Sequence, residues 1–238
     1  MLARSSMREA IVLAGGKAER LGDAAQGLPK ALVPVAGRPL AAYQLALLRA
    51  AGVERVIVSC AAGKGPLFSA ALAGLGVDVS PVEEPEPLGR GGGLRHAAAA
   101  RLEPGDVFAL NGDELLDLDL RRLAARHREA GAAATITVTR PASPFGVVEL
   151  DGDDRVTGFE EAARVPWWVS CGVYVLGEEA IARLPARGDH ETSTFPELAA
   201  AGRLAALRHD GLWITVNTPK DLRRAEEFLA AHPDWPAA

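Results

Sequence analysis

The chain has 238 residues, of which 48% are hydrophobic and 24% are charged, a composition typical of soluble globular proteins. Its formal net charge of −5 argues against generic nucleic-acid binding, because such surfaces are usually basic. No apolar stretch reaches the roughly 18 residues of a membrane span, and the first residues lack the apolar segment and cleavage site of a signal peptide. We therefore expect a cytoplasmic protein with no nucleic-acid or membrane partner.

The first 139 residues alternate between short apolar runs and helical patterns. The apolar runs predict strands over 8–13, 55–60, 77–82, 106–110 and 134–139. Helical periodicity between them predicts helices over 40–51, 66–75, 92–102 and 120–130. This order predicts an α/β fold with a Rossmann-like, mostly parallel sheet flanked by helices. Cys60 and Cys171 each lie in a strand-like run, and we expect two buried free thiols.

The pattern changes after residue 140. Asp151-Gly152 separates two apolar runs, 145–150 and 155–159, and predicts a β-hairpin. The remaining runs predict strands over 169–176, 203–208 and 212–216, with helices near 178–184 and 193–201. A final helix is expected over 218–231, with Thr218 as its N-cap. We interpret residues 1–238 as one domain whose second half contains a small β insertion and a C-terminal helix.

A glycine-rich segment with three cations follows the first predicted strand. The cations are Lys17, Arg20 and Lys30. In such a setting backbone N–H groups converge on phosphate, whereas the alternative is a flexible loop with solvated cations. The segment GGKAERLG does not have the spacing of a Walker A loop. A second cluster, LGRGGGLRHA, has Leu94 where a dinucleotide-binding fingerprint requires a small residue, so a nicotinamide site is not expected.

The string LAGGKAERLG, followed by LPKALVPVAGRPL, resembles the signature of the sugar-phosphate nucleotidyltransferases. The likeness continues in order through EEPEPLGRGGGLRHA, NGDELL, FGVVELDGDDRVTGFEE, SCGVYVL and a closing segment that contains GLWITVNTPKDLRRAEEF. Within this family the chain is most similar to short mannose- or heptose-1-phosphate guanylyltransferase-like members. The resemblance implies a GT-A-like nucleotidyltransferase fold in which residues 1–139 bind the nucleotide and residues 140–238 bind the sugar phosphate.

The reaction implied by the resemblance joins a nucleoside triphosphate to a sugar 1-phosphate and releases pyrophosphate, with Mg²⁺ as cofactor. The implied catalytic residues, which hold the triphosphate and the developing charge, are Arg20 and Lys30. The implied nucleotide contacts are Leu13, Ala14, Gly15, Gly16, Glu84 and Gly89. The implied sugar-phosphate contacts are Arg90, Gly112, Glu161 and Gly172. The implied magnesium ligands are Asp113 and Asn217.

Two of these residues also have a simpler interpretation. A carboxylate at Glu84 can accept hydrogen bonds from the N1–H and amino groups of guanine, which favours GTP as the donor. The alternative is a solvated glutamate beside Glu83 and Glu86. Asp113 could equally be part of a turn, since Asn, Gly and Asp favour turns.

Four positions depart from the family pattern, all on the acceptor and metal side. Arg90 stands where threonine is common in the family, and Ala162 stands where many members have a lysine. Ser170-Cys171 replaces the usual asparagine and alanine, and Thr215 stands where many members have a second metal-binding aspartate. Arg164 or Arg90 could replace the missing lysine charge. Three functions therefore stay open: transfer to an unusual sugar or cyclitol phosphate, transfer to a non-sugar phosphate, and nucleotide binding by a regulatory homologue with impaired catalysis. A homodimer is a further expectation.

Overall fold

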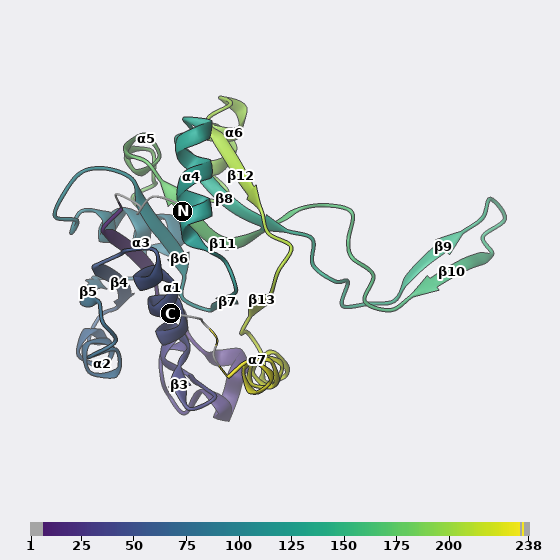
Figure 1. Cartoon of the computed structure of the whole chain (residues 1–238), viewed down its shortest axis with the longest axis horizontal. Helices are drawn as coiled ribbons and strands as arrows, with labels where there is room; N and C mark the ends of the chain where they lie inside the picture. Colours follow the sequence, from purple (N-terminus) through teal and green to yellow (C-terminus); the bar gives the residue numbers. More distant parts are fainter. Residues whose placement is uncertain (1–6, 234, 236–238) are drawn as a thin grey trace.

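The computed structural model describes residues 7–233 and 235 and shows a seven-stranded sheet covered by helices (Figure 1). The strand order is β12-β8-β11-β6-β1-β4-β5. The strands are β1 (Glu9–Leu13), β4 (Arg55–Ala61), β5 (Asp78–Glu84), β6 (Val107–Asn111), β8 (Ala134–Thr139), β11 (Val169–Leu176) and β12 (Leu204–Arg208). Strand β11 is antiparallel to β6 and β8, and the other pairs are parallel. The predicted α/β, mostly parallel sheet is confirmed.

Helices cover both faces of this sheet, which is why its strands read as continuous apolar runs. One core lies between the sheet and α1 (Leu40–Ala50), α2 (Gly65–Ala71) and α4 (Leu120–Ala130). The other core lies between the sheet and α3 (Gly89–Ala98), α5 (Glu178–Ala182) and α6 (Thr194–Ala200). Along β1, Val12 packs into the first core and Ile11 into the second, as strand alternation requires. Cys60 and Cys171 are buried and free, as expected.

A third, smaller core joins the start of the chain to its end. It includes residues of the 3₁₀ helix η1 (Glu19–Ala25) and of strand β2 (Pro34–Val35), which pairs with β3 (Arg38–Pro39). It also includes residues of the short pair β7 (Glu114–Leu116) and β13 (Trp213–Thr215). Helix α7 (Pro219–Ala231) packs on them, and a second 3₁₀ helix, η2 (Lys30–Leu32), lies nearby in sequence. At the start of α7, Thr218 and Asp221 form a reciprocal capping box, which confirms the predicted N-cap.

Several boundaries differ from the sequence-based expectation. Helices α2 and α3 end at Ala71 and Ala98, four residues earlier than expected. Two other differences follow from tertiary contacts. Strand β5 continues to Glu84 because it pairs with β4 as far as Ala61. Helix α3 begins at Gly89 rather than at residue 92, so the glycine cluster forms its first turn. These glycines lie against the 185–190 segment, and a Cβ added at Gly91 would come within 2.7 Å of the His190 backbone nitrogen.

The predicted hairpin is confirmed and extends away from the sheet (Figure 1). It consists of β9 (Val147–Leu150) and β10 (Val156–Glu160), and we call residues 140–168, which carry it, the arm. Within the described chain, all exposed large hydrophobic side chains except Leu67 and Leu102 lie on this arm. Among all residues that the structure describes, none of the helices combines the length and the apolar character needed to span a membrane.

Candidate active site

The carboxyl ends of β1, β4, β5 and β6 border a pocket of about 770 Å³. This edge of an open α/β sheet is where such folds bind ligands, because the loops that leave adjacent parallel strands diverge there. All the site residues expected from the sequence line the pocket, with the exception of Glu161 and Gly172. The pocket is lined mostly by the first half of the chain, and the second half contributes Thr215 and Asn217.

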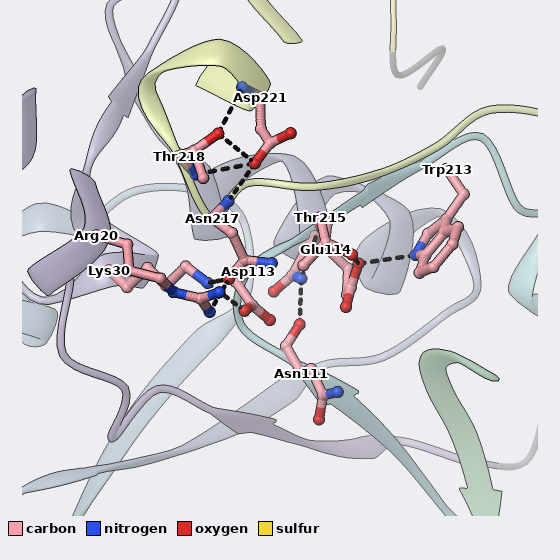
Figure 2. Close-up of polar contacts among 11 residues, drawn as sticks. Arg20, Lys30, Asn111, Asp113, Glu114, Trp213, Thr215, Asn217, Thr218 and Asp221 are labelled. Carbon is pink, nitrogen blue, oxygen red and sulfur yellow. Dashed lines mark hydrogen bonds and ion pairs between the residues drawn. The ribbon is translucent and has the colours of Figure 1, made fainter. Parts of the chain in front are cut away.

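Arg20, Lys30, Asp113 and Asn217 converge at one wall of this pocket (Figure 2). The Lys30 ammonium donates to Asp113 Oδ2 and to Asn217 Oδ1, at 2.5 Å each. Arg20 Nη2 donates to the same Asn217 oxygen at 2.8 Å. Lys30 is only 9% exposed, and a buried ammonium requires such partners. Four segments that are distant in sequence, η1, η2, the end of β6 and the residues before α7, therefore form one charged cluster.

The Gly15–Gly16 backbone lies beside this cluster and is anchored on both sides. Ala14 N donates to the Ser59 carbonyl at 2.7 Å, and Lys30 N donates to the Gly16 carbonyl at 3.4 Å. Within the described residues, no acceptor is bonded to the N–H groups of Gly15 and Gly16, and both residues are exposed. The loop thus has free amide donors at residues that line the pocket, as an anion site requires.

Glu84 lies at the end of β5 and is buried, at 8% exposure, whereas Glu83 and Glu86 are exposed. Its Oε1 accepts from Ser59 Oγ at 2.9 Å, and its Oε2 accepts from Leu88 N at 3.0 Å. The interpretation of Glu84 as a solvated glutamate is therefore wrong. Glu83 instead accepts hydrogen bonds from two glycine amides, at residues 63 and 65, and these lower the pKa of its carboxyl group.

Glu114 is a pocket residue that the sequence did not single out. It is 4% exposed, and its Oε2 accepts from Trp213 Nε1 and Thr215 Oγ1, at 2.8 Å each. Burial, followed by the adjacent charge of Asp113, raises the pKa of Glu114 to about 8. The available signal was a carboxylate directly before an apolar pair in NGDELL. Its importance was hidden because β7 is three residues long and pairs with β13, about a hundred residues later.

Three of the residues expected to contact the sugar phosphate do not face the pocket with a free polar group. Arg90 lines the pocket, but its guanidinium is bound to Asp189 and Glu191, so its charge is already compensated. Glu161 is exposed on the arm and does not line the pocket. Gly172 lies just behind the pocket, in contact with residues that do line it. Arg164, considered as a replacement cation, donates to the Arg140 carbonyl at the base of the arm.

Comparison with known proteins agrees with the fold and the motifs described above. Residues 9–232 match the Nucleotidyl transferase family. The mannose-1-phosphate guanylyltransferase of Mycobacterium tuberculosis is 34% identical over 232 residues, which cover 93% of this chain and 64% of that protein. The chain therefore spans less than two thirds of that relative's length.

Two solved structures have the same fold. HddC from Yersinia pseudotuberculosis, complexed with GMP-PN, has a TM-score of 0.73 at 24% identity and covers 94% of this chain and 100% of its own. The inositol-1-phosphate CTP transferase from T. maritima has a TM-score of 0.74 at 20% identity and covers 99% and 100%. These two structures confirm the fold expected from the sequence, whereas the family match and the M. tuberculosis relative confirm the resemblance. The chain belongs to the Nucleotidyl transferase family.

Proposed function

We propose that the chain transfers a nucleotidyl group from a nucleoside triphosphate, with GTP favoured, to a sugar 1-phosphate, and releases pyrophosphate. The observation that carries this proposal is the convergence of Arg20, Lys30, Asp113 and Asn217 beside the free amides of the glycine loop. The M. tuberculosis relative, named a mannose-1-phosphate guanylyltransferase, supports a guanosine donor and a hexose 1-phosphate acceptor.

The reaction requires little covalent chemistry from the protein. An oxygen of the acceptor phosphate forms a bond to the α-phosphorus, and the bond from this phosphorus to the bridging oxygen breaks, so that the electron pair leaves with pyrophosphate. The protein must hold two polyanions in line and neutralise the charge that develops. Arg20 can bind phosphate oxygens in bidentate fashion, Lys30 supplies a point charge, and the Gly15–Gly16 amides add neutral donors.

Asp113 and Asn217 suit a magnesium ion. Their side-chain oxygens both accept from the Lys30 ammonium, so they already face a single cationic position. Mg²⁺ is commonly held by one or two protein oxygens, with substrate phosphates and water as the other ligands. When bound, the ion would neutralise phosphate charge.

Glu84 supports guanine as the base. Each carboxylate oxygen can accept two hydrogen bonds, and Ser59 and Leu88 use one on each oxygen. One acceptor position remains on each oxygen, which matches the N1–H and amino donors of guanine.

We also infer a homodimer and a reducing, cytoplasmic environment. The exposed apolar side chains of the arm support a contact with a second copy, because such clusters on a protein surface usually mark interaction sites. The two free, buried cysteines support a reducing compartment.

A panel of substrates tests the proposed function. The protein would be incubated with each common nucleoside triphosphate, Mg²⁺ and hexose, heptose or cyclitol 1-phosphates, and pyrophosphate would be measured. We expect release that depends on the acceptor and is fastest with GTP. Tight nucleotide binding without pyrophosphate from any combination would contradict the proposal and favour a regulatory homologue.

Asp113→Asn tests the charged cluster. Asparagine still accepts a hydrogen bond from Lys30 but removes the negative charge, so we expect kcat to fall about a hundredfold or more with little change in melting temperature. Asp210→Asn, in an exposed loop outside the pocket, is the matched control. Unchanged turnover in Asp113→Asn would place the metal elsewhere.

A further inference from the structure

Glu114 is a buried carboxylate in the pocket, and the charge of Lys30 affects its pKa less than burial and the charge of Asp113 do. Among the described residues, no Lys, Arg or His nitrogen lies within 4.0 Å of its carboxylate oxygens. Burying a carboxylate without such a partner costs free energy, and an apolar side chain would fill the same volume without this cost. The position therefore calls for a role that an apolar side chain cannot perform.

The β7–β13 pair fixes the direction of this side chain (Figure 2). Glu114 lies directly opposite Thr215 in the antiparallel register, and Trp213 is two residues away on the same strand. Both donate to Oε2, whereas Oε1 accepts no hydrogen bond from the described residues and is not sealed from solvent. One carboxylate oxygen is therefore anchored, and the other is available to a ligand in the pocket.

Gly172 on β11 makes room for this arrangement. Its φ is +70°, and a Cβ there would lie 2.5 Å from Asn111 Nδ2 and 3.0 Å from Glu114 Oε1. Any larger residue would displace these two polar groups. Asn111 also lines the pocket, and its main-chain carbonyl and that of Glu114 are joined by Gln44 Nε2, at 2.7 and 2.9 Å. Gln44 thus links the backbone at Asn111 to the backbone at Glu114, so that the Asn111 amide and the Glu114 carboxylate are held close together.

The sheet order places Asn111 and Glu114 at the opposite end of the pocket from Glu84. Glu84 ends β5 and Asn111 ends β6, and strands β4 and β1 lie between them. The glycine loop leaves β1, between the two ends. A nucleotide with its base at Glu84 and its phosphates over the glycine loop therefore directs the acceptor toward Glu114.

We propose that Glu114 determines acceptor specificity, by exchanging a hydrogen bond through Oε1 with a hydroxyl group of a polyhydroxylated acceptor. This inference rests on the proposed function. A hydroxyl both donates and accepts, so it can bond the carboxyl group in either protonation state. Sites built to bind a hydroxyl reject analogues that lack it, because the buried polar group is then left unpaired.

The test compares wild type with Glu114→Met and Glu114→Gln. Methionine has a similar length and no hydrogen-bonding oxygen, whereas glutamine keeps one. We expect the KM for the acceptor to rise about ten- to hundredfold in Glu114→Met and less in Glu114→Gln. The Kd for nucleotide with Mg²⁺, measured by calorimetry, should stay within about twofold. Glu179→Met, which removes a hydrogen-bonded carboxylate on α5 outside the pocket, is the matched control.

Monodeoxy acceptors identify the contact. One monodeoxy analogue should bind wild type more weakly than the full acceptor does. In Glu114→Met this analogue and the full acceptor should bind equally well, because the variant already lacks the carboxylate that contacts the missing hydroxyl. An unchanged acceptor KM in Glu114→Met overturns the proposal. The proposal is also overturned if, for every analogue, the affinity lost with the hydroxyl adds to the affinity lost by the mutation. Loss of nucleotide–Mg²⁺ affinity overturns it too, since Glu114 would then serve the cation.

Two further controls keep the outcomes separate. Wild type is measured first; if it releases no pyrophosphate with any acceptor, the proposed function fails, and this inference fails with it. If Glu114→Met does not fold, Thr215→Val removes one donor to Oε2 and should raise the acceptor KM by a smaller factor. An unchanged KM in that variant would also count against the proposal.

Discussion

Glu84 and Glu114 show how the same residue type can have different hydrogen-bond surroundings in one pocket. Both are buried carboxylates that line one pocket. Glu84 keeps an acceptor position on each oxygen, since Ser59 and Leu88 use one each, which suits two adjacent donors on a base. Glu114 has both protein donors on one oxygen and leaves the other open, which suits a single hydroxyl.

Exchange of Glu84 for glutamine should change base preference. Glutamine presents one acceptor and one donor group, a pattern that fits uracil or thymine better than guanine. We expect the ratio of kcat/KM for GTP to that for UTP to fall about tenfold or more, because a mismatched polar group in the pocket is left unpaired. Steady-state kinetics with both nucleotides measure it, and an unchanged ratio would remove Glu84 from base recognition.

At the scale of elements, the first turn of α3 depends on glycine. Gly89 has φ +77°, and a Cβ there would lie 2.6 Å from the Gly188 carbonyl oxygen. We expect Gly89→Ala to lower the free energy of unfolding by about 1–3 kcal/mol. Urea denaturation checks this, with Gly152→Ala in the hairpin turn as the control, because that site is open and has no positive φ. Equal changes in the two variants would contradict the close approach.

The arm leads to a prediction about association. A two-stranded ribbon is marginally stable alone, and this one exposes apolar side chains such as Val148 and Val156, at 47% and 61%. If a second copy covers it, replacing both with threonine should lower the dimer fraction in light scattering. The melting temperature of the body should change little, because exposed substitutions are usually nearly neutral. A wild type that is monomeric at all concentrations would show the homodimer expectation to be wrong.

At the scale of the whole molecule, buried histidines set part of the pH dependence of stability. His190 is fully buried between Tyr174 and Phe195, and its ring nitrogens have no hydrogen-bond partner among the described residues. Burial lowers the pKa of His190 below 6.5, against the opposing charges of Glu191 and Asp189 and together with the charge of Arg90. The unfolded chain therefore binds more protons below pH 6.5, and stability falls as the pH falls.

Urea denaturation at pH 7.5, 6.5 and 5.5 tests this contribution. His190→Phe keeps an aromatic ring and removes the titration, so its stability should fall less steeply with decreasing pH than that of wild type. The comparison isolates His190, since His127, whose pKa is also lowered by burial, titrates in both proteins. Parallel curves would show that His190 does not contribute.

The sheet, the hairpin, the capped last helix and the residues of the glycine loop could be predicted from the sequence alone. These depend on local patterns: apolar periodicity, turn residues and motif spacing act between near neighbours in the chain. Asp113 and Asn217 could be named from motifs, but the shared contact with Lys30 required the fold, because 187 positions separate Lys30 from Asn217.

The surroundings of the individual pocket side chains, in contrast, required the tertiary structure. It separated buried Glu84 from exposed Glu83 and Glu86, occupied Arg90 with two carboxylates, and left Glu161 on the arm. It also brought Glu114 into the pocket through a three-residue strand that pairs with residues 213–215. Burial and pairing of this kind arise when distant segments pack together, and no local pattern in the sequence carries that information.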